Sequence, residues 1–270
     1  MKPSGIITLT TDFGLSDPYV AIIKGVILSI NPQARIVDVT HRVSPGLLFQ
    51  AAGIIEETVK YFPEGTVNLI VVDPGVGGQR RPIAFETEKS FFVAPDNGVL
   101  WPVLEGQGTS KVVHLTATKY FLPHISDTFH GRDIFAPIAA HISLGTDISK
   151  MGSIIADPMK LKILKPHIKG RVLYGEVIRV DNFGNLITNI HQAELEAFLQ
   201  AASPIVRLGK LTIQEIRNIY TSVSEGEPLA LYGSSHLLEI AVNMGKASDI
   251  LGLRHDKIIG ASVAITKNDE

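Results

Sequence analysis

Residues Leu69–Pro82, LIVVDPGVGGQRRP, decide how this chain folds. The apolar, β-branched run Leu69–Val72 has the length and composition of a strand that is buried on both faces. It ends at Asp73, and a glycine-rich loop with Arg80 and Arg81 follows. Because the carboxyl ends of strands in open parallel α/β sheets line the ligand crevice, this stretch predicts a polar site at a strand end. Taken alone, it fits equally well a Pro-Gly turn whose aspartate caps its own backbone.

A second strand upstream shows the same pattern. Ile6–Thr10 reads as a buried strand, and it too runs into an aspartate, Asp12. The intervening residues predict, in order, a helix that ends at Ile30, a strand at Ile36–Val39 and an amphipathic helix at Leu47–Phe62, before the strand Val67–Val72. This β-α-β-α-β order predicts a parallel sheet, so Asp12 and Asp73 should emerge at the same edge.

Two polar stretches are expected to begin helices. Asp17 is predicted to cap the first helix, with Pro18 in its first turn. The cluster Thr128–Asp133, TFHGRD, directly precedes an apolar helical segment, Ile134–Leu144. Its simplest interpretation is a helix cap by Asp133 beside a solvated His130.

The chain continues with further strands and then changes character. Strands are predicted at Phe91–Ala94 and Lys111–Leu115, with a short helix at Val99–Leu104 between them. A lysine- and proline-rich linker at about 156–170 then separates an α/β domain, residues 1–160, from a smaller β-rich, barrel-like domain, residues 170–265. In this second domain the predicted strands are Gly175–Val180, Leu186–Ile190, Pro204–Leu208 and Leu229–Tyr232, and the predicted helices are Glu194–Ala201 and Ile213–Asn218. Its most polar turns are Asp181–Asn185 and Gly233–Ser235, which hairpin chemistry alone explains.

Composition narrows the possible functions. The chain has 270 residues, 45% hydrophobic content and a net charge of −2, which suits a globular protein without a nucleic-acid footprint or an anionic membrane partner. Cysteine is absent, so disulfides, thiol catalysis and thiolate metal sites are excluded. The amino terminus, MKPSGIITLTTD, lacks an apolar signal region, which favours the cytoplasm. Small molecules are therefore the expected partners.

Six segments together resemble one family. They are IITLTTDFGLSDPYVAIIKGVI, VDVTHRVSPG, VVDPGVGGQRR, FHGRDIFAP, RVDNFGNLITNI and SSHLLEIAVN. In this order they resemble the S-adenosyl-L-methionine hydrolases that form adenosine, the SAM hydroxide adenosyltransferases, which are relatives of the fluorinase and chlorinase. The resemblance implies a homotrimer that binds S-adenosyl-L-methionine between the first domain of one subunit and the second domain of its neighbour. It implies no further cofactor and no metal.

The resemblance also implies a role for particular residues. Asp73, Arg80 and His130 would form the water-activating set. The expected substrate-binding residues are Asp12 for the ribose hydroxyls, Asp181 and Ser234 for the amino acid group of methionine, Phe183 and Asn185 for adenine, and in addition Asp17 and Ser235. Ser235 stands where the fluorinase has an arginine, and no role is assigned to His236. The halogenases have tyrosine at the position of Asp73, and tyrosine followed by serine or glycine at the positions of His130 and Gly131.

Chemistry supports the assignment independently. One ionised carboxylate can accept both hydroxyls of a ribose diol, which suits Asp12. A sulfonium leaves C5′ as a neutral thioether without a general acid, so the task of the site is to orient and deprotonate water. Either Asp73 or His130 can take that proton, while Arg80 holds Asp73 or stabilises the developing hydroxide.

Three other functions are compatible with these residues. One is halide transfer by a chlorinase-like enzyme. Another is a metal-dependent hydrolase, with Asp73, His130, Asp133 and His114 as ligands, although Arg80 would repel a cation. A third is a non-catalytic nucleotide-binding module, with DPGVGG as a phosphate nest, although no P-loop lysine follows it.

Overall fold

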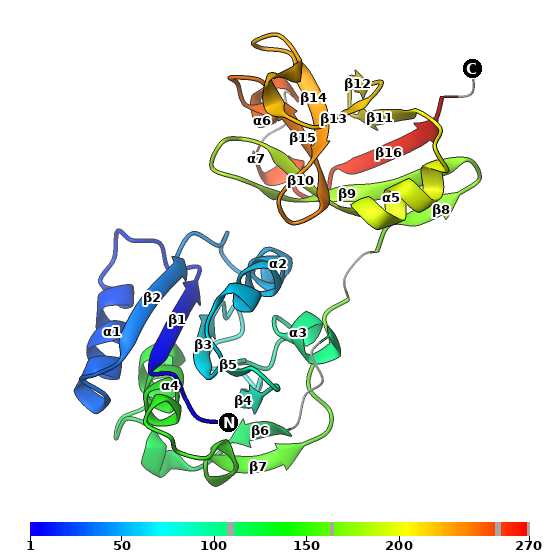
Figure 1. Cartoon of the computed structure of the whole chain (residues 1–270). Coiled ribbons are helices and arrows are strands. Elements are labelled where there is room, and N and C mark those ends of the chain that lie inside the picture. Colours follow the sequence, from blue (N-terminus) through cyan, green and yellow to red (C-terminus); the bar gives the residue numbers. More distant parts are fainter. Residues whose placement is uncertain (107–110, 163–164, 252–254, 269–270) are drawn as a thin grey trace. The chain divides into compact units, whose positions relative to one another are not determined.

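The structure is a computed structural model that describes residues 1–106, 111–162, 165–251 and 255–268. Contacts within the chain divide it into two compact units, Met1–Lys162 and Ile163–Glu270. Figure 1 shows the α/β character of the first unit and the strand-rich character of the second.

The first unit is organised around a mixed sheet. Its described strands follow the order β2-β1-β3-β5-β4-β6-β7. The pairs β2–β1, β1–β3 and β3–β5 are parallel, whereas β5–β4, β4–β6 and β6–β7 are antiparallel. The strands are β1 (Ile6–Thr11), β2 (Arg35–Thr40), β3 (Thr66–Val71), β4 (Pro82–Glu86), β5 (Ser90–Pro95), β6 (Lys111–Leu115) and β7 (Gly152–Ile155).

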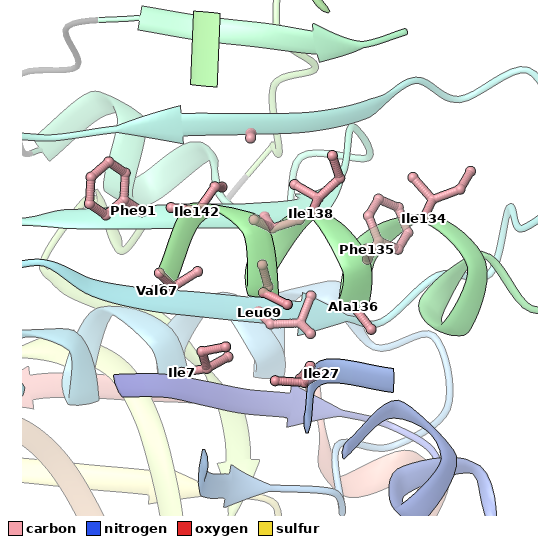
Figure 2. Close-up of a cluster of buried hydrophobic side chains, with 14 of the residues drawn as sticks. Ile7, Ile27, Val67, Leu69, Phe91, Ile134, Phe135, Ala136, Ile138 and Ile142 are labelled. Carbon is pink, nitrogen blue, oxygen red and sulfur yellow. The ribbon is translucent and has the colours of Figure 1, made fainter. Parts of the chain in front are cut away.

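Helices pack on this sheet through two apolar clusters. The helices are α1 (Tyr19–Ile30), α2 (Leu48–Thr58), α3 (Trp101–Gly106) and α4 (Ala136–Ser143), and a π-helical turn, Gly131–Phe135, leads into α4. One cluster joins α1, α4 and the π-helical turn to β1, β3 and β5, as Figure 2 shows for Ile7, Leu69 and Ile138. The other cluster joins α2 and α3 to the sheet through side chains such as Ile55, Val103 and Phe92. The β3 strand is buried along its whole length, as its apolar sequence predicts.

The parallel arrangement predicted for the first half of the chain is confirmed, and so is the mixed α/β class. The β4 strand was not predicted. It begins at Pro82, directly after the arginine pair, and forms an antiparallel hairpin with β5 in which Pro82 faces Pro95. Proline cannot donate a backbone hydrogen bond, so it suits the first residue of a strand and weakens the strand signal in the sequence.

The cap predicted for α1 is wrong. The helix begins at Tyr19 with Pro18 at the cap position, and no side chain caps it. The Ile22 amide instead donates to the Pro18 carbonyl, and Asp17 lies exposed in the preceding loop. Proline fixes its own φ near the helical value, which allows it to begin the helix without a polar cap.

The second unit is β-rich and barrel-like. Its described strands follow the order β12-β11-β16-β9-β10-β15-β14-β13, and β8 pairs with β9. The strands are β8 (His167–Lys169), β9 (Val172–Val180), β10 (Leu186–His191), β11 (Pro204–Leu208), β12 (Leu211–Ile213), β13 (Ile216–Arg217), β14 (Pro228–Tyr232), β15 (Leu237–Val242) and β16 (Ser262–Lys267). The helices are α5 (Gln192–Leu199), α6 (Ala247–Ile250) and α7 (His255–Ile258). One apolar cluster, which includes Val177, Leu195 and Ile265, fills its interior.

The helix predicted at Ile213–Asn218 is also wrong. This segment contains the end of β12 and the short strand β13, which pairs in parallel with β14. Its isoleucines are β-branched, and the pairing partners available in the sheet outweigh the helical spacing of the sequence.

Candidate active site

Asp73, Arg80 and His130 come together at the carboxyl end of β3. The Arg80 Nε donates to both carboxylate oxygens of Asp73 at 3.0 Å, and Nη2 also contacts Oδ2. The same Nη2 lies 2.8 Å from His130 Nδ1. The side chains of Arg80 and Asp73 are 10% and 5% exposed, so solvent screens this ion pair weakly. Arg80 therefore bridges the two other members of the set.

The backbone permits this arrangement through two glycines. Gly77 has φ +74°, and a Cβ there would lie 2.2 Å from the Asp127 carbonyl oxygen. The loop after Asp73 thus packs directly on the segment that precedes His130. At Gly131 a Cβ would lie 3.1 Å from Val71 Cγ1, at the end of β3. The absence of a side chain at both positions brings the His130 segment close to the strand end.

The neighbours of His130 determine its protonation. Burial, and next the positive charge of Arg80, lower the pKa of His130 below its usual value. The neutral imidazole is therefore favoured. A guanidinium only donates, so Nδ1 accepts from Arg80, and we assign the remaining ring proton to Nε2.

An aromatic ring packs against the guanidinium of Arg80. The guanidinium carbon of Arg80 lies 5.3 Å from the centre of the Phe135 ring, which is fully buried in the π-helical turn. This cation–π contact helps to fix the guanidinium plane. Phe135 was not expected at the site from the sequence, although its position five residues after His130 in an apolar segment was the available signal.

Asp12 lies at the end of the neighbouring strand. The parallel register pairs Thr11 of β1 with Val71 of β3, so Asp12 and Asp73 leave the sheet at the same edge, as expected. The Gly46 amide donates to Asp12 Oδ2 at 2.9 Å. A Cβ at Gly46 would meet Pro74 Cβ at 3.3 Å, so the loop that holds Asp12 also packs beside Asp73. Gly46 was not expected from the sequence to link these two loops.

In the second unit, Asp181, Phe183 and Asn185 share one turn between β9 and β10. Asp181 Oδ1 accepts from the amides of Phe183 and Asn185 at 2.8 and 2.9 Å, and Oδ2 accepts from the Asn185 side chain at 2.9 Å. Asn185 is buried, whereas the Phe183 side chain is 74% exposed. Hairpin chemistry therefore accounts for the turn itself, and it leaves an aromatic ring in solvent.

Ser234 and Ser235 lie on another turn, between β14 and β15. The antiparallel register pairs Leu186 with Ile240 and His191 with Leu237, so the two turns lie at opposite ends of the β10–β15 pair. Adjacent strand ends therefore do not bring these two turns together, as they do for Asp12 and Asp73.

A tyrosine–glutamate pair lies between these two turns, and sequence reasoning missed it. Tyr220 donates to Glu239 Oε2 at 3.1 Å. Burial, followed by the charges of Glu239 and Asp181, raises the pKa of Tyr220 to about 12. A Cβ at Gly233 would lie 1.7 Å from Glu239 Oε1, so this buried carboxylate packs under the serine turn. A glutamate inside the apolar run of β15 was the signal.

The set proposed above as metal ligands is not gathered in the structure. Asp133 is buried in the π-helical turn, where it accepts from Arg132 and from the Ser126 amide instead of capping a helix. Both carboxylate oxygens of Asp73 already contact Arg80. Within the described ranges, no three histidine or acidic side chains are grouped so that they could hold a metal ion. None of the described helices is long and apolar enough to cross a membrane.

The comparisons with known proteins agree along the length of the chain. Residues 7–152 match the N-terminal domain of the SAM hydroxide adenosyltransferases, and residues 175–259 match the C-terminal domain. A protein from Salinispora tropica named (R)-S-adenosyl-L-methionine hydrolase is 36% identical over 94% of this chain and 96% of its own. The protein of the same name from Thermus thermophilus is 37% identical over 90% and 94%. A fluorinase from an Actinoplanes species is 31% identical over 71% of this chain and 73% of its own.

A solved structure extends this agreement to the fold. An uncharacterized conserved protein from Thermotoga maritima is similar with a TM-score of 0.88 and 37% identity, and the match covers 97% of this chain and 100% of that one. The two chains therefore share one fold. Together with the matches to both family domains, this similarity shows that the chain belongs to the SAM hydroxide adenosyltransferase family.

Proposed function

We propose that this protein hydrolyses S-adenosyl-L-methionine to adenosine and L-methionine by attack of an activated water on C5′. The observation that carries the proposal is the set formed by the buried Asp73–Arg80 pair and the half-buried His130, at the sheet edge that also holds Asp12. The hydrolases of that name among its relatives, which are 33–37% identical, support the same reaction.

The hydrogen bonds of the set support a separate role for each of its residues. His130 in its neutral form accepts from Arg80 at Nδ1 and carries its proton on Nε2, so neither ring nitrogen has a free lone pair. Asp73 is an acceptor and is held in place by Arg80. Asp73 therefore takes the proton from water, and His130 Nε2–H donates to the water oxygen. Arg80 stabilises the negative charge of the developing hydroxide.

The reaction needs no general acid. The water oxygen forms a bond to C5′ while the C5′–S bond breaks. The electron pair of the C5′–S bond goes to sulfur. The sulfonium becomes the neutral thioether of methionine, and the proton leaves through Asp73 to solvent. The site thus contributes orientation, a proton acceptor and electrostatic stabilisation.

Substrate binding is divided between the two units. Asp12 binds the ribose hydroxyls, and Asp17 lies on the exposed loop that follows it. In the second unit Asp181 and Ser234 bind the amino acid group, Phe183 and Asn185 bind adenine, and Ser235 is adjacent to the amino acid group. We propose that the two parts meet in a homotrimer, where a domain at 1–160 of one subunit faces a domain at 170–265 of the next. A cytoplasmic location and the absence of any further cofactor are part of the same proposal.

Halide transfer is the closest competing activity, because fluorinases are among the relatives. An ionised Asp73 next to the nucleophile position repels an anion and accepts hydrogen bonds from water, which favours hydrolysis. A non-catalytic nucleotide-binding module is less well supported, because binding alone gives no reason for a preorganised carboxylate–arginine–histidine set.

The test is incubation with S-adenosyl-L-methionine in ¹⁸O-labelled water, with high chloride or fluoride, followed by chromatography and mass spectrometry. We expect adenosine with ¹⁸O at its 5′ oxygen, together with methionine. Asp73→Ala and His130→Ala should each lower kcat by roughly 10²–10⁴-fold, with substrate binding largely retained. A 5′-halogenated deoxyadenosine as the main product, or unlabelled adenosine, would refute the hydrolase assignment. Tight adenosine binding without turnover of any adenosyl substrate would favour the binding module.

A further inference from the structure

A buried histidine lies behind the Asp12 loop and takes no part in the site described above. His41 follows β2 and is 4% exposed. Its Nδ1 lies 2.9 Å from Thr11 Oγ1, at the end of β1. Its Nε2 is buried 3.0 Å from Asp38 Oδ1, an ion-pair contact whose angle falls outside hydrogen-bond geometry. Lys24 of α1 reaches the other oxygen of Asp38 at 2.6 Å. These four side chains connect the surface to the residue before Asp12.

The charge of Asp38 determines which ring nitrogen of His41 acts as a donor toward it. Burial raises the pKa of Asp38, but the hydrogen bond from Lys24 and the contact with His41 outweigh it, so the net pKa lies below the usual value. An ionised carboxylate only accepts, so Nε2 of His41, which faces it, carries a proton. Nδ1 and the Thr11 hydroxyl share the other hydrogen bond of the ring.

The same contacts hold the backbone on both sides of Asp12. Thr11 Oγ1 accepts from the Phe13 amide at 3.3 Å. The Gly14 amide donates to the His41 carbonyl at 2.7 Å, and the Val43 amide donates to the Thr11 carbonyl at 3.3 Å. His41 and its neighbours thus fix the residues that immediately precede and follow Asp12, while the Gly46 amide fixes its carboxylate.

A hydroxyl, an imidazole and a carboxylate in this order also suggest a nucleophile with its base. Thr11 is only 1% exposed, and its hydroxyl is bound on one side by His41 and on the other by the Phe13 amide. A substrate atom has no access to it. The arrangement therefore acts on the position of Asp12 and not on a bond of the substrate.

We propose that His41 and Thr11 are positioning residues for Asp12, and that they determine how strongly this protein distinguishes a nucleoside with a ribose diol from one without it. This inference rests on the ribose-binding role of Asp12 in the proposed function. A loop carboxylate accepts two hydroxyls at once only if it is held within a fraction of an ångström, and here that constraint comes from residues behind it.

The test compares the affinities for adenosine and 2′,3′-dideoxyadenosine by calorimetry. Thr11→Val removes the hydroxyl at nearly constant volume, and Thr11→Ser is the matched control that retains it. His41→Gln is an independent variant that still reaches Asp38 but no longer meets Thr11. We expect the wild type and Thr11→Ser to prefer adenosine, and Thr11→Val and His41→Gln to lose about tenfold of that preference, with dideoxyadenosine binding nearly unchanged.

The possible outcomes separate this inference from the proposed function. Full preference for adenosine in both Thr11→Val and His41→Gln, or equal losses for both nucleosides, would overturn it. A wild type that binds the two nucleosides equally would remove Asp12 from the ribose site, and the inference with it. Failure of the hydrolase assignment would give another result: the wild type would form no adenosine from S-adenosyl-L-methionine but would still bind adenosine more tightly than 2′,3′-dideoxyadenosine.

Discussion

Removal of Arg80 should destabilise the first unit strongly, because it leaves the buried Asp73 carboxylate without its ion-pair partner. Arg80→Met retains most of the aliphatic volume and the packing on Phe135 but removes the contacts to both oxygens of Asp73. With the two side chains 10% and 5% exposed, the pair falls in the buried class. Loss of one partner of such a pair costs about 3–5 kcal/mol, because the remaining charge stays desolvated.

A double-mutant cycle separates the cost of the unpaired charge from the cost of lost packing. Asp73→Asn alone should cost about 1.5–3 kcal/mol, the usual value of a hydrogen bond to a charged group. Arg80→Met with Asp73→Asn leaves no unpaired charge, so we expect it to be about as stable as Arg80→Met alone or more stable. The coupling between the two changes should therefore be roughly 2 kcal/mol.

The single tryptophan of the chain provides the assay. Trp101 lies in α3, within the first unit, so its fluorescence during urea unfolding reports on that unit selectively. Unchanged m-values across the cycle would show that the midpoints report stability. The reasoning is refuted if the double variant loses the sum of the two single losses, or if Arg80→Met costs less than about 1 kcal/mol, as a solvent-screened surface pair would.

Five further outcomes are expected. Arg80→Met should raise the pKa of His130, because a positive charge that lowers it is removed, and a proton NMR titration of the ring would contradict this by showing an unchanged or lower pKa. In the wild type, where the neutral ring is favoured, hydrolysis should hold as pH falls to about 6.5, the ordinary value for histidine, and decline only below it. Gly131→Ala should destabilise the first unit by about 1–3 kcal/mol, since its Cβ would lie 3.1 Å from Val71 and 3.3 Å from Ile23, and an equally stable variant in thermal unfolding would show that these side chains yield. Asp12→Ala should weaken adenosine and S-adenosyl-L-methionine alike, by about tenfold to a hundredfold, and unchanged calorimetric affinity for adenosine would exclude Asp12 from the site. Mixing inactive Asp73→Ala and Asp181→Ala proteins, after dissociation and reassembly, should restore some activity, whereas no rescue in mixed trimers verified by mass spectrometry would place each site within one chain.

The sequence predicted the strand ends of the first unit well because they depend on local signals. Runs of apolar residues that stop at aspartate with proline or glycine nearby mark where a buried strand reaches an edge. The parallel order then follows from the alternation of strands and helices, and it brings Asp12 and Asp73 to neighbouring strand ends. Both inferences use only short-range pattern and general rules of topology.

The partners of the two adjacent arginines show where this reasoning stops. Arg80 pairs with Asp73, whereas Arg81 donates to Asp96 at 2.8 Å and to Asp157 at 2.9 Å. Adjacent residues of an extended segment point to opposite sides, so only the register of the β4–β5 hairpin decides which arginine faces the site. Because that hairpin was not predicted, the sequence pattern alone did not decide between Arg80 and Arg81, and the resemblance to the family supplied that choice.

The hydrogen bonds already present at each carboxylate leave room for the donors that each is proposed to bind. A carboxylate has roughly four acceptor positions. Asp181 uses three of them for its own turn, which leaves space for one donor of an ammonium group. Asp12 accepts from the Gly46 amide, which leaves positions for both hydroxyls of a ribose. Because each carboxylate is held by donors of its own unit, substrate binding does not have to order either loop, and its binding energy remains available for alignment of the water with the C5′–S bond.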